Sequence, residues 1–303
     1  MQKLRPLLVL SAALTGGCSS APEADVQERA DRDAPPYRQA VFVDSERARK
    51  LERAYPAIEA IFRENAAAQH YVGQAFGVVV DGELAFARTL GVSNLDTQRP
   101  VDTGTKFHIA SLTKSFTSMA ILRLRDEGAL SLQDPVVLHV PEFTGAVALT
   151  RDAPAVTIDQ LMTMTSGLPE DNPWADRHLE DDEEQLLGLV RGGLSFSSAP
   201  GSAYEYSNLG YALLGTIVTR VSGRSYERYI TEELLDPLGM FDTHWDFGDV
   251  PLVELANGYR WEDGRWKREP MLHYGAVGAI GGLMTALDDC SKYVAVHLNA
   301  CPA

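Results

Sequence analysis

The sequence is poor in positive charge and, after its first residues, has no long apolar run. Its 27 lysine and arginine residues face 42 aspartate and glutamate residues, which gives a formal net charge of −15 at pH 7. Such a surface repels nucleic acid and anionic lipid headgroups, so we expect no nucleic-acid partner. Beyond the N-terminus, no apolar stretch approaches the roughly 20 residues that a membrane-spanning helix needs.

Two common hydrolase motifs are also absent. There is no Gly-x-Ser-x-Gly, which argues against an α/β-hydrolase. There is no His-Glu-x-x-His, which argues against a zinc hydrolase. The acidic run over residues 179–184 has only His178 beside it, so a solvated helix start is favoured over a metal site. We expect no metal and no organic cofactor.

Cysteine is scarce, with three residues in 303. Cys290 and Cys301 flank or lie in a helix expected over residues 287–298. If that helix were continuous, eleven residues would separate the two by about 16 Å, which is too far for a disulfide. We therefore expect unpaired thiols at both positions.

The third cysteine, Cys18, belongs to the N-terminal segment. Residues 1–17 combine a charged start with a short apolar run, which predicts a signal peptide. Thr15-Gly16-Gly17-Cys18 resembles a bacterial lipoprotein signal, in which the cysteine carries the lipid, although Thr15 stands where leucine is usual. We expect export, either as a periplasmic protein or as a lipoprotein attached to the membrane only through Cys18. Residues 18–43, rich in Ala, Pro, Asp and Glu, predict a flexible tether.

The stretch 107–117 carries residues suited to nucleophilic catalysis. Ser111 and Lys114 are three apart, so on a helix they share one face within hydrogen-bond reach. A serine needs a base to become a nucleophile, and a lysine can serve only if its pKa falls toward about 7–8. Apolar residues follow at helical spacing, so we expect burial to desolvate Lys114. Eighteen serines and six lysines predict roughly 0.4 Ser-x-x-Lys by chance, so this motif alone is weak.

Tyr206-Ser207-Asn208 is the second element and the only Tyr-x-Asn in the chain. In extended backbone, residues two apart point the same way, so Tyr206 and Asn208 could both face a cleft. A tyrosine oxygen there could shuttle a proton. An asparagine amide could position both Lys114 and a substrate carbonyl.

These motifs, in this order, resemble the β-lactamase-related serine hydrolases. The matching segments are residues 107–114, 157–168, 200–215 and 281–285. That family includes class C β-lactamases, D-Ala-D-Ala carboxypeptidases, D-amino-acid peptidases and serine esterases. The resemblance implies that Ser111 is the acylated nucleophile and Lys114 its proton acceptor. It further implies that Tyr206 is a general acid/base and that Asn208 orients the substrate.

One departure from the family concerns its third motif, Lys-Thr-Gly or His-x-Gly, on a core strand that donates an oxyanion-hole N–H. No Lys-[Ser/Thr]-Gly occurs here. The one His-x-Gly, His273-Tyr274-Gly275, lies just before Gly281, whereas the family's strand follows that glycine at a distance. We favour the interpretation that the closing C-terminal strands are missing, with His273 as the less favoured alternative.

The expected fold is α+β, of the α/β sandwich type: an antiparallel sheet flanked by helices, plus a mostly helical subdomain at about 135–240. Residues 44–303 would form this domain. The local patterns predict a hairpin over 75–87 around Asp81-Gly82 and a helix over 51–69, in which Pro56 marks either a kink or a second start. The helix that carries Ser111 is expected to end at Asp126-Glu127-Gly128. The other predicted features are helices over 184–190, 209–221, 226–235 and 287–298, a capping box at Thr157 and Gln160, a loop over 132–141, and turns near four aromatic residues (Trp245, Tyr259, Trp261, Trp266).

The resulting functional hypothesis is an exported serine hydrolase that acts through an acyl-enzyme. Its substrate would be a β-lactam, a D-amino-acid peptide or an ester, and the motifs do not choose among them. The alternative is a catalytically impaired family member that binds cell-wall peptide or has no activity.

Overall fold

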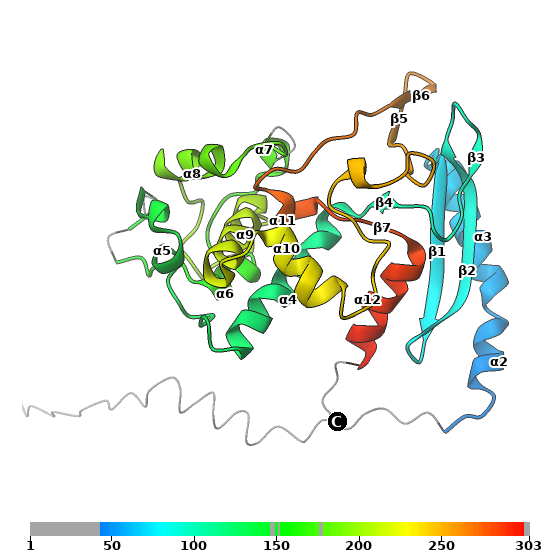
Figure 1. Ribbon diagram of the computed structural model, residues 1–303, viewed down its shortest axis with the longest axis horizontal. Coiled ribbons are helices and arrows are strands. Elements are labelled where there is room, and N and C mark those ends of the chain that lie inside the picture. Colours follow the sequence, from blue (N-terminus) through cyan, green and yellow to red (C-terminus); the bar gives the residue numbers. More distant parts are fainter. Residues whose placement is uncertain (1–42, 146–148, 151, 176–177, 300–303) are drawn as a thin grey trace, which may run out of the picture. The chain divides into compact units, whose positions relative to one another are not determined.

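The computed structural model describes residues 43–145, 149–150, 152–175 and 178–299 (Figure 1). These residues belong to one unit, Val43–Ala300. The expected signal peptide, Cys18, Cys301 and all of the expected tether except Val43 lie outside the described residues. Among the helices that are described, none has both the length and the apolar character needed to cross a bilayer.

A three-stranded antiparallel sheet forms one end of this unit. Its order is β1 (Gly73–Val80), β2 (Glu83–Asn94) and β3 (Arg99–Pro100). Asp81 and Gly82 join β1 to β2 with φ angles of 54° and 85°, the left-handed backbone that two-residue hairpins favour. The expected hairpin is confirmed. β2 continues beyond the predicted range, because its residues 88–91 still pair with β1 and Val92 and Asn94 pair with β3.

Two helices precede the sheet. α2 (Arg47–Glu52) and α3 (Tyr55–Ala68) are separate, and Pro56 lies in the first turn of α3, where its missing N–H costs nothing. Of the two alternatives for Pro56, a kink or a second start, the second is correct. α3 packs on the sheet through stacked rings, Tyr55 on Phe86 and Phe62 on Phe76, with centroid distances of 4.5 and 4.0 Å.

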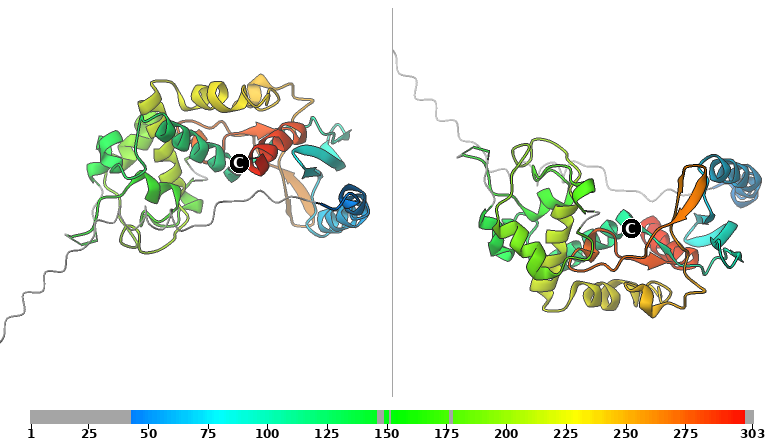
Figure 2. Two further views of the ribbon diagram at one scale, coloured as in Figure 1. Left: turned by 90° about the horizontal axis from the view of Figure 1, so that it is seen from below. Right: turned by 90° about the horizontal axis from the view of Figure 1, so that it is seen from above.

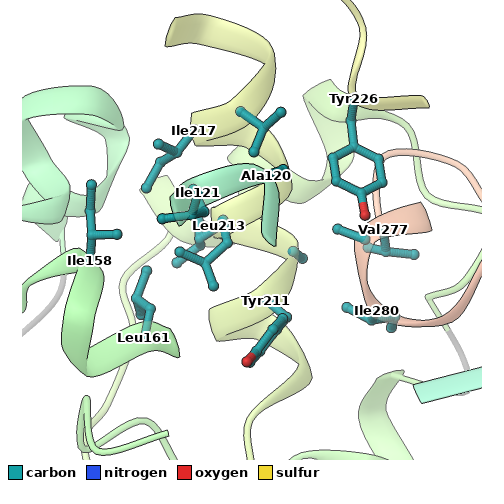
Figure 3. Close-up of a cluster of buried hydrophobic side chains, with 14 of the residues drawn as sticks. Ala120, Ile121, Ile158, Leu161, Tyr211, Leu213, Ile217, Tyr226, Val277 and Ile280 are labelled. Atoms are coloured by element: carbon teal, nitrogen blue, oxygen red, sulfur yellow. The ribbon is translucent and has the colours of Figure 1, made fainter. Parts of the chain in front are cut away.

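The core of the unit is built from α4 (Thr113–Asp126), α9 (Asn208–Ser222) and α11 (Gly278–Gly281). Figure 3 shows Ala120 and Ile121 of α4 next to Leu213 and Ile217 of α9. A side chain at Gly215 would put its Cβ 2.6 Å from the Cβ of Ala279, so glycine lets α9 and α11 approach closely. Directly before α4 the chain forms the short strand β4 (Phe107–His108) and the 3₁₀ turn η1 (Ala110–Leu112). β4 pairs with β7 (Met284–Thr285).

Short helices make up most of the rest. They are α5 (Val136–His139), η2 (Pro141–Gly145), α6 (Ile158–Met162), α7 (Asn172–Ala175), α8 (Glu183–Arg191), α10 (Tyr226–Ile230), the π-helical turn η3 (Thr231–Leu235) and η4 (Phe247–Asp249). The predicted capping box of Thr157 and Gln160 is present at α6. A second box, formed by Asp182 and Gln185, begins α8 within the acidic run. The predicted loop over 132–141 is partly wrong, because burial of Val136 holds a helical turn there.

The last elements are the hairpin of β5 (Tyr259–Glu262) and β6 (Arg265–Arg268) and the helix α12 (Leu287–Asn299). Trp261 and Trp266 meet edge-to-face across that hairpin, with centroids 4.8 Å apart. Trp245 packs on Tyr226 in α10 instead. α12 packs on β1 and β2 and contains Cys290, an unpaired thiol. Figure 2 shows the helices α5–α9 and the sheet at opposite ends of the unit, with α4, α11 and α12 between them.

Candidate active site

Ser111 lies in the turn η1, directly before α4, and is solvent-exposed. Its Oγ accepts hydrogen bonds from two side chains: Lys114 Nζ at 3.1 Å and Tyr206 OH at 2.8 Å. The three residues that the sequence predicted to act together are therefore in direct contact. Ser111 is the second residue of its turn, and the N–H groups at a helix start have no partner within the helix. They can bind negative charge that develops beside the hydroxyl.

Lys114, in the first turn of α4, is only 5% exposed. Besides Ser111, its Nζ donates to the carbonyl oxygen of Ile280 at 2.7 Å. Burial disfavours the charged ammonium and lowers the pKa of Lys114 from 10.5 to about 8, while the carboxylate of Asp171 acts in the opposite direction. A sizeable fraction of this lysine is consequently a neutral amine near pH 7–8, the form that can accept a proton.

Two tyrosine rings flank this amine. Nζ of Lys114 lies 5.1 Å from the ring centroid of Tyr206 and 5.8 Å from that of Tyr211. The negative faces of such rings attract a cation within about 6 Å. The rings partly compensate the protonated amine for its lost water, while the hydroxyl of Tyr206 reaches Ser111.

Tyr206 ends the loop that leads into α9, and Ser207 caps that helix. The backbone of Ser207 is extended, and its Oγ accepts from the N–H of Gly210 at 3.2 Å. A serine cap with extended backbone is a favoured helix start. The cap fixes where the preceding residue points, so the local sequence itself aims Tyr206 toward Ser111.

Asn208 is the first residue of α9 and is 4% exposed. Its amide nitrogen donates to Asp171 Oδ1 at 3.1 Å and to Asn172 Oδ1 at 2.9 Å. Within the described residues, the hydrogen bonds of Lys114 go to Ser111 and Ile280. The expected contact between the Asn208 amide and Lys114 is thus not made, because Asp171 and Asn172 take that amide. Substrate orientation by Asn208 stays a prediction.

The segment around α11 holds the start of α4 in place. Leu283 exchanges two bonds with this region: its N–H donates to Thr113 Oγ1 at 3.2 Å, and its carbonyl accepts from the N–H of Ile109 at 3.0 Å. Thr117 Oγ1 donates to the carbonyl of Ala279 at 2.8 Å. Ala110, immediately before Ser111, has a φ of 45°, a left-handed conformation that costs energy for a residue with a Cβ. Strain therefore lies next to the nucleophile.

His273 is exposed and has its contacts elsewhere. Its Nδ1 lies 3.2 Å from Asp246 Oδ2, and its ring packs on Phe247 at 4.3 Å. Among the described residues, no hydrogen bond joins His273 to Ser111, Lys114 or Tyr206. The less favoured alternative, in which His273 replaces the family's third motif, has no support in this geometry.

Two parts of the site were missed from the sequence. One is the carbonyl of Ile280, a backbone atom that leaves no signature in residue types, although the neighbouring glycines at 281 and 282 belong to a segment that resembles the family. The other is Asp171, three residues after the matched segment 157–168. A single aspartate in a polar stretch carries no pattern by which its role could be recognised.

Comparison with known proteins agrees with this geometry. The family model described as Beta-lactamase matches residues 58–300. Protein flp of Staphylococcus aureus (strain MRSA252) is 35% identical over 204 residues, which cover 67% of this chain and 40% of that protein. Beta-lactamase-like protein 2 of Dictyostelium discoideum is 30% identical over 260 residues, covering 83% of this chain and 47% of that protein.

Among solved structures, the octameric penicillin-binding protein homologue from Pyrococcus abyssi has a TM-score of 0.73 at 30% identity, with 82% of this chain and 57% of that chain covered. The chain thus spans less than half of the length of the two curated relatives described here. Because the family model covers most of the sequence, and because the fold agrees, the chain belongs to the beta-lactamase family.

Proposed function

We propose that this protein is a serine hydrolase that works through an acyl-enzyme formed on Ser111. One observation carries the proposal: a buried lysine with a pKa of about 8 and a tyrosine hydroxyl both contact the Oγ of one exposed serine. A serine that lacks such neighbours is a poor nucleophile, and a buried base of this kind removes that barrier.

In the first step, neutral Lys114 takes the proton of Ser111 as Oγ attacks a carbonyl carbon. The carbonyl π-electrons move to oxygen, where the N–H groups at the start of η1 and α4 stabilise the charge. As the tetrahedral intermediate collapses, Tyr206 delivers a proton to the leaving nitrogen or oxygen and is reprotonated through Lys114. Water then attacks the acyl-enzyme with the same groups in reversed roles, which releases the acid and restores Ser111.

The substrate of this chemistry is a carbonyl compound with a leaving group: an amide, a β-lactam or an ester. The exposed position of Ser111 suits a substrate that approaches from solvent. Ser111, Lys114 and Tyr206 would serve all three substrate classes. The choice among a β-lactam, a D-amino-acid peptide and an ester therefore depends on the residues that line the acyl and leaving-group sides of the site.

We also propose that the protein acts after export, in the periplasm or on a membrane to which a lipid at Cys18 attaches it. The support is the N-terminal sequence: a charged start, a short apolar run and Thr15-Gly16-Gly17-Cys18. The strongly acidic composition agrees with a solvated surface and argues against a nucleic-acid partner. Labelling with a radioactive fatty acid, compared between the wild type and Cys18→Ser, tests the anchor.

A second candidate function is binding of cell-wall peptide without turnover. It is favoured by the sequence, which has no Lys-[Ser/Thr]-Gly, and by the pairing of His273 with Asp246 away from Ser111. A site with one oxyanion donor fewer is expected to react about 10²–10³ times more slowly. Slow acylation with slower release would make such a protein a binder in practice.

The deciding experiment is covalent labelling of the purified full chain with a fluorophosphonate and, separately, with a fluorescent penicillin. We expect wild type and Ser115→Ala to be labelled and Ser111→Ala to remain unlabelled. Ser115 is the matched control because it lies one turn along, with its Oγ bonded to the carbonyl of Leu112. Peptide mapping should locate the adduct on Ser111.

Turnover separates the two candidates. Nitrocefin, a D-Ala-D-Ala peptide and short-chain p-nitrophenyl esters are each incubated with wild type and Ser111→Ala. Ser111-dependent product release beyond one equivalent supports the hydrolase and identifies its substrate. A single equivalent of label that persists supports the binder, and labelling that survives in Ser111→Ala would refute both mechanisms.

A further inference from the structure

Asp171 occupies an unusual position beside the start of α9. Its two carboxylate oxygens accept four hydrogen bonds from three consecutive residues. Oδ1 accepts from the backbone N–H of Asn208 at 2.7 Å and from its amide Nδ2 at 3.1 Å. Oδ2 accepts from the backbone N–H of Leu209 at 2.8 Å and from Ser207 Oγ at 3.2 Å. Both oxygens are thus fully used, so Asp171 is not arranged to bind a ligand itself.

These four bonds fix the segment that follows Tyr206. The first N–H groups of a helix have no partner within it, and a carboxylate at that end is favoured by the helix dipole as well. α9 is 15 residues long and runs through the core. Tyr206 directly precedes the bonded residues, so the direction of its side chain depends on Asp171 as well as on the Ser207 cap.

Asp171 also acts on Lys114 at a distance. Burial lowers the pKa of Lys114, and the negative charge of Asp171 raises it, so the value of about 8 is the balance of the two. Glu170, the neighbouring carboxylate, faces a different partner: its Oε1 accepts from the N–H of Asn172 at 3.0 Å. Of these two adjacent acids, Asp171 bonds residues 207–209 directly, whereas Glu170 bonds only the backbone of Asn172 among the described residues, so Glu170 serves as the control carboxylate.

We propose that Asp171 is a positioning residue of the acyl-transfer site: its carboxylate holds the start of α9 and thereby the turn that presents Tyr206 to Ser111. This inference rests on the proposed function for its catalytic meaning. Its structural content, a link between Asp171 and the titration of Lys114, can be measured without any reaction.

The first experiment follows the six lysines of the chain by NMR. Wild type, Asp171→Asn, Asp171→Glu and Glu170→Gln are prepared with ¹³C at lysine Cε, and Lys114→Arg assigns the Lys114 resonance by its loss. We expect that resonance to titrate near pH 8 in wild type and Glu170→Gln, and at lower pH in Asp171→Asn. Asp171→Glu keeps the charge and should stay closer to wild type. Equal midpoints in Asp171→Asn and wild type would overturn the electrostatic part.

The second experiment measures the rate of fluorophosphonate labelling against pH for the same variants and for Asp171→Ala. At high pH, where the amine is neutral in every variant, Asp171→Ala should label about tenfold to a hundredfold more slowly, because small displacements of a catalytic group cost this much. Glu170→Ala should label at the wild-type rate. Asp171→Glu, with its oxygens displaced, should be slow at the plateau while its midpoint stays near that of wild type.

The combined results show which part of the proposal fails, if any does. General loosening of the fold would hydrate Lys114 and move the midpoint to higher pH, so a midpoint at lower pH in Asp171→Asn supports the specific role. Wild-type plateaus in both Asp171→Ala and Asp171→Glu would overturn the positioning part. If the wild type is not labelled on Ser111 at all, the proposed function fails, while the NMR titration still decides whether Asp171 acts on Lys114.

Discussion

Two buried lysines, eight residues apart, lie on either side of the nucleophile. Lys106 is 4% exposed and Lys114 is 5% exposed. Lys106 contacts two carboxylates, Asp242 at 2.8 Å and Glu254 at 2.7 Å. Lys114 contacts a hydroxyl and a backbone carbonyl. Burial lowers the pKa of both, but at Lys106 the two carboxylates outweigh it, and the pKa of that residue is raised.

Burial alone therefore does not make a lysine into a base; the neighbours decide. An ammonium beside carboxylates is stabilised as a charge and serves to hold segments together, here β4 and the stretch 242–254. An ammonium beside dipoles only is easily deprotonated and becomes available for proton transfer. Substituting one lysine at a time should separate two consequences: loss of catalysis at Lys114 and loss of stability at Lys106.

The largest effect is expected from Lys114→Met, which keeps an unbranched apolar side chain similar to the lysine stem and removes the amine. Without the proton acceptor, the rate of Ser111 labelling by a fluorophosphonate should fall by about 10³–10⁴-fold. Lys106→Met should label at close to the wild-type rate. Equal losses in the two variants would show that the contrast between the lysines has no catalytic meaning.

The same pair predicts opposite dependences of stability on pH. For Lys114, a pKa of about 8 in the folded protein against 10.5 in the unfolded chain means that the unfolded chain binds more protons between these values. The free energy of unfolding of the wild type, relative to Lys114→Met, should therefore rise by roughly 3 kcal/mol from pH 7 to above pH 10. For Lys106 the folded pKa is raised, so its contribution is complete below pH 10.5 and is lost only at higher pH.

Urea titrations at a series of pH values measure both differences. Each variant is compared with the wild type at the same pH, which removes groups that titrate in all three proteins. A difference between wild type and Lys114→Met that stays constant from pH 7 to 10 would contradict the lowered pKa.

A smaller effect is expected at the phenol of Tyr206, whose hydroxyl contacts Ser111. Tyr206→Phe removes the hydroxyl that contacts Ser111 and keeps the ring beside Nζ. Turnover of a substrate that passes the Ser111-labelling test should fall by about a hundredfold, as for loss of a general acid. Tyr211→Phe is the matched control, because its ring also faces Lys114 but its hydroxyl bonds Ser118 and the carbonyl of Met162. Equal effects of the two variants would assign the role to the rings rather than to the hydroxyl of Tyr206.

The sequence was sufficient for the elements whose apolar spacing is long enough to be periodic. α4, α9 and α12 follow their predicted ranges closely, and the side chains of Thr157 and Gln160 mark the start of α6. Strands β4 and β7 have two residues each, too few for any period to register. The prediction also placed Ser111 within the helix, whereas it lies in the 3₁₀ turn before it.

In the active site, contacts between residues close in sequence could be predicted, whereas contacts between distant segments could not. Ser111 and Lys114 meet because three residues separate them, and that spacing is visible in the sequence. The carbonyl of Ile280 reaches Lys114 across 166 residues, and Glu254 reaches Lys106 across 148. Residue order marks Lys114 by its spacing from Ser111, but it does not show that Lys106 will gain two carboxylates or which carbonyl Lys114 will gain. The contrast that matters most for function is therefore a product of tertiary packing.

The smallest expected effect concerns the stability of Lys106→Met near pH 7. The side chain of Lys106 is buried, but those of Asp242 and Glu254 are 59% and 40% exposed, so both carboxylates regain water when the ammonium is removed. The loss is then limited to about 1–2 kcal/mol in the free energy of unfolding. The backbone bonds of Lys106 to Glu254 and Ala256 remain and keep the segments together. Lys106→Arg, which retains the charge, should lose less.

A loss well above 3 kcal/mol for Lys106→Met, or a matching fall in Ser111 labelling, would mean that this ion pair supports the geometry of the active site. The division of the two lysines into one structural and one catalytic residue would then no longer hold.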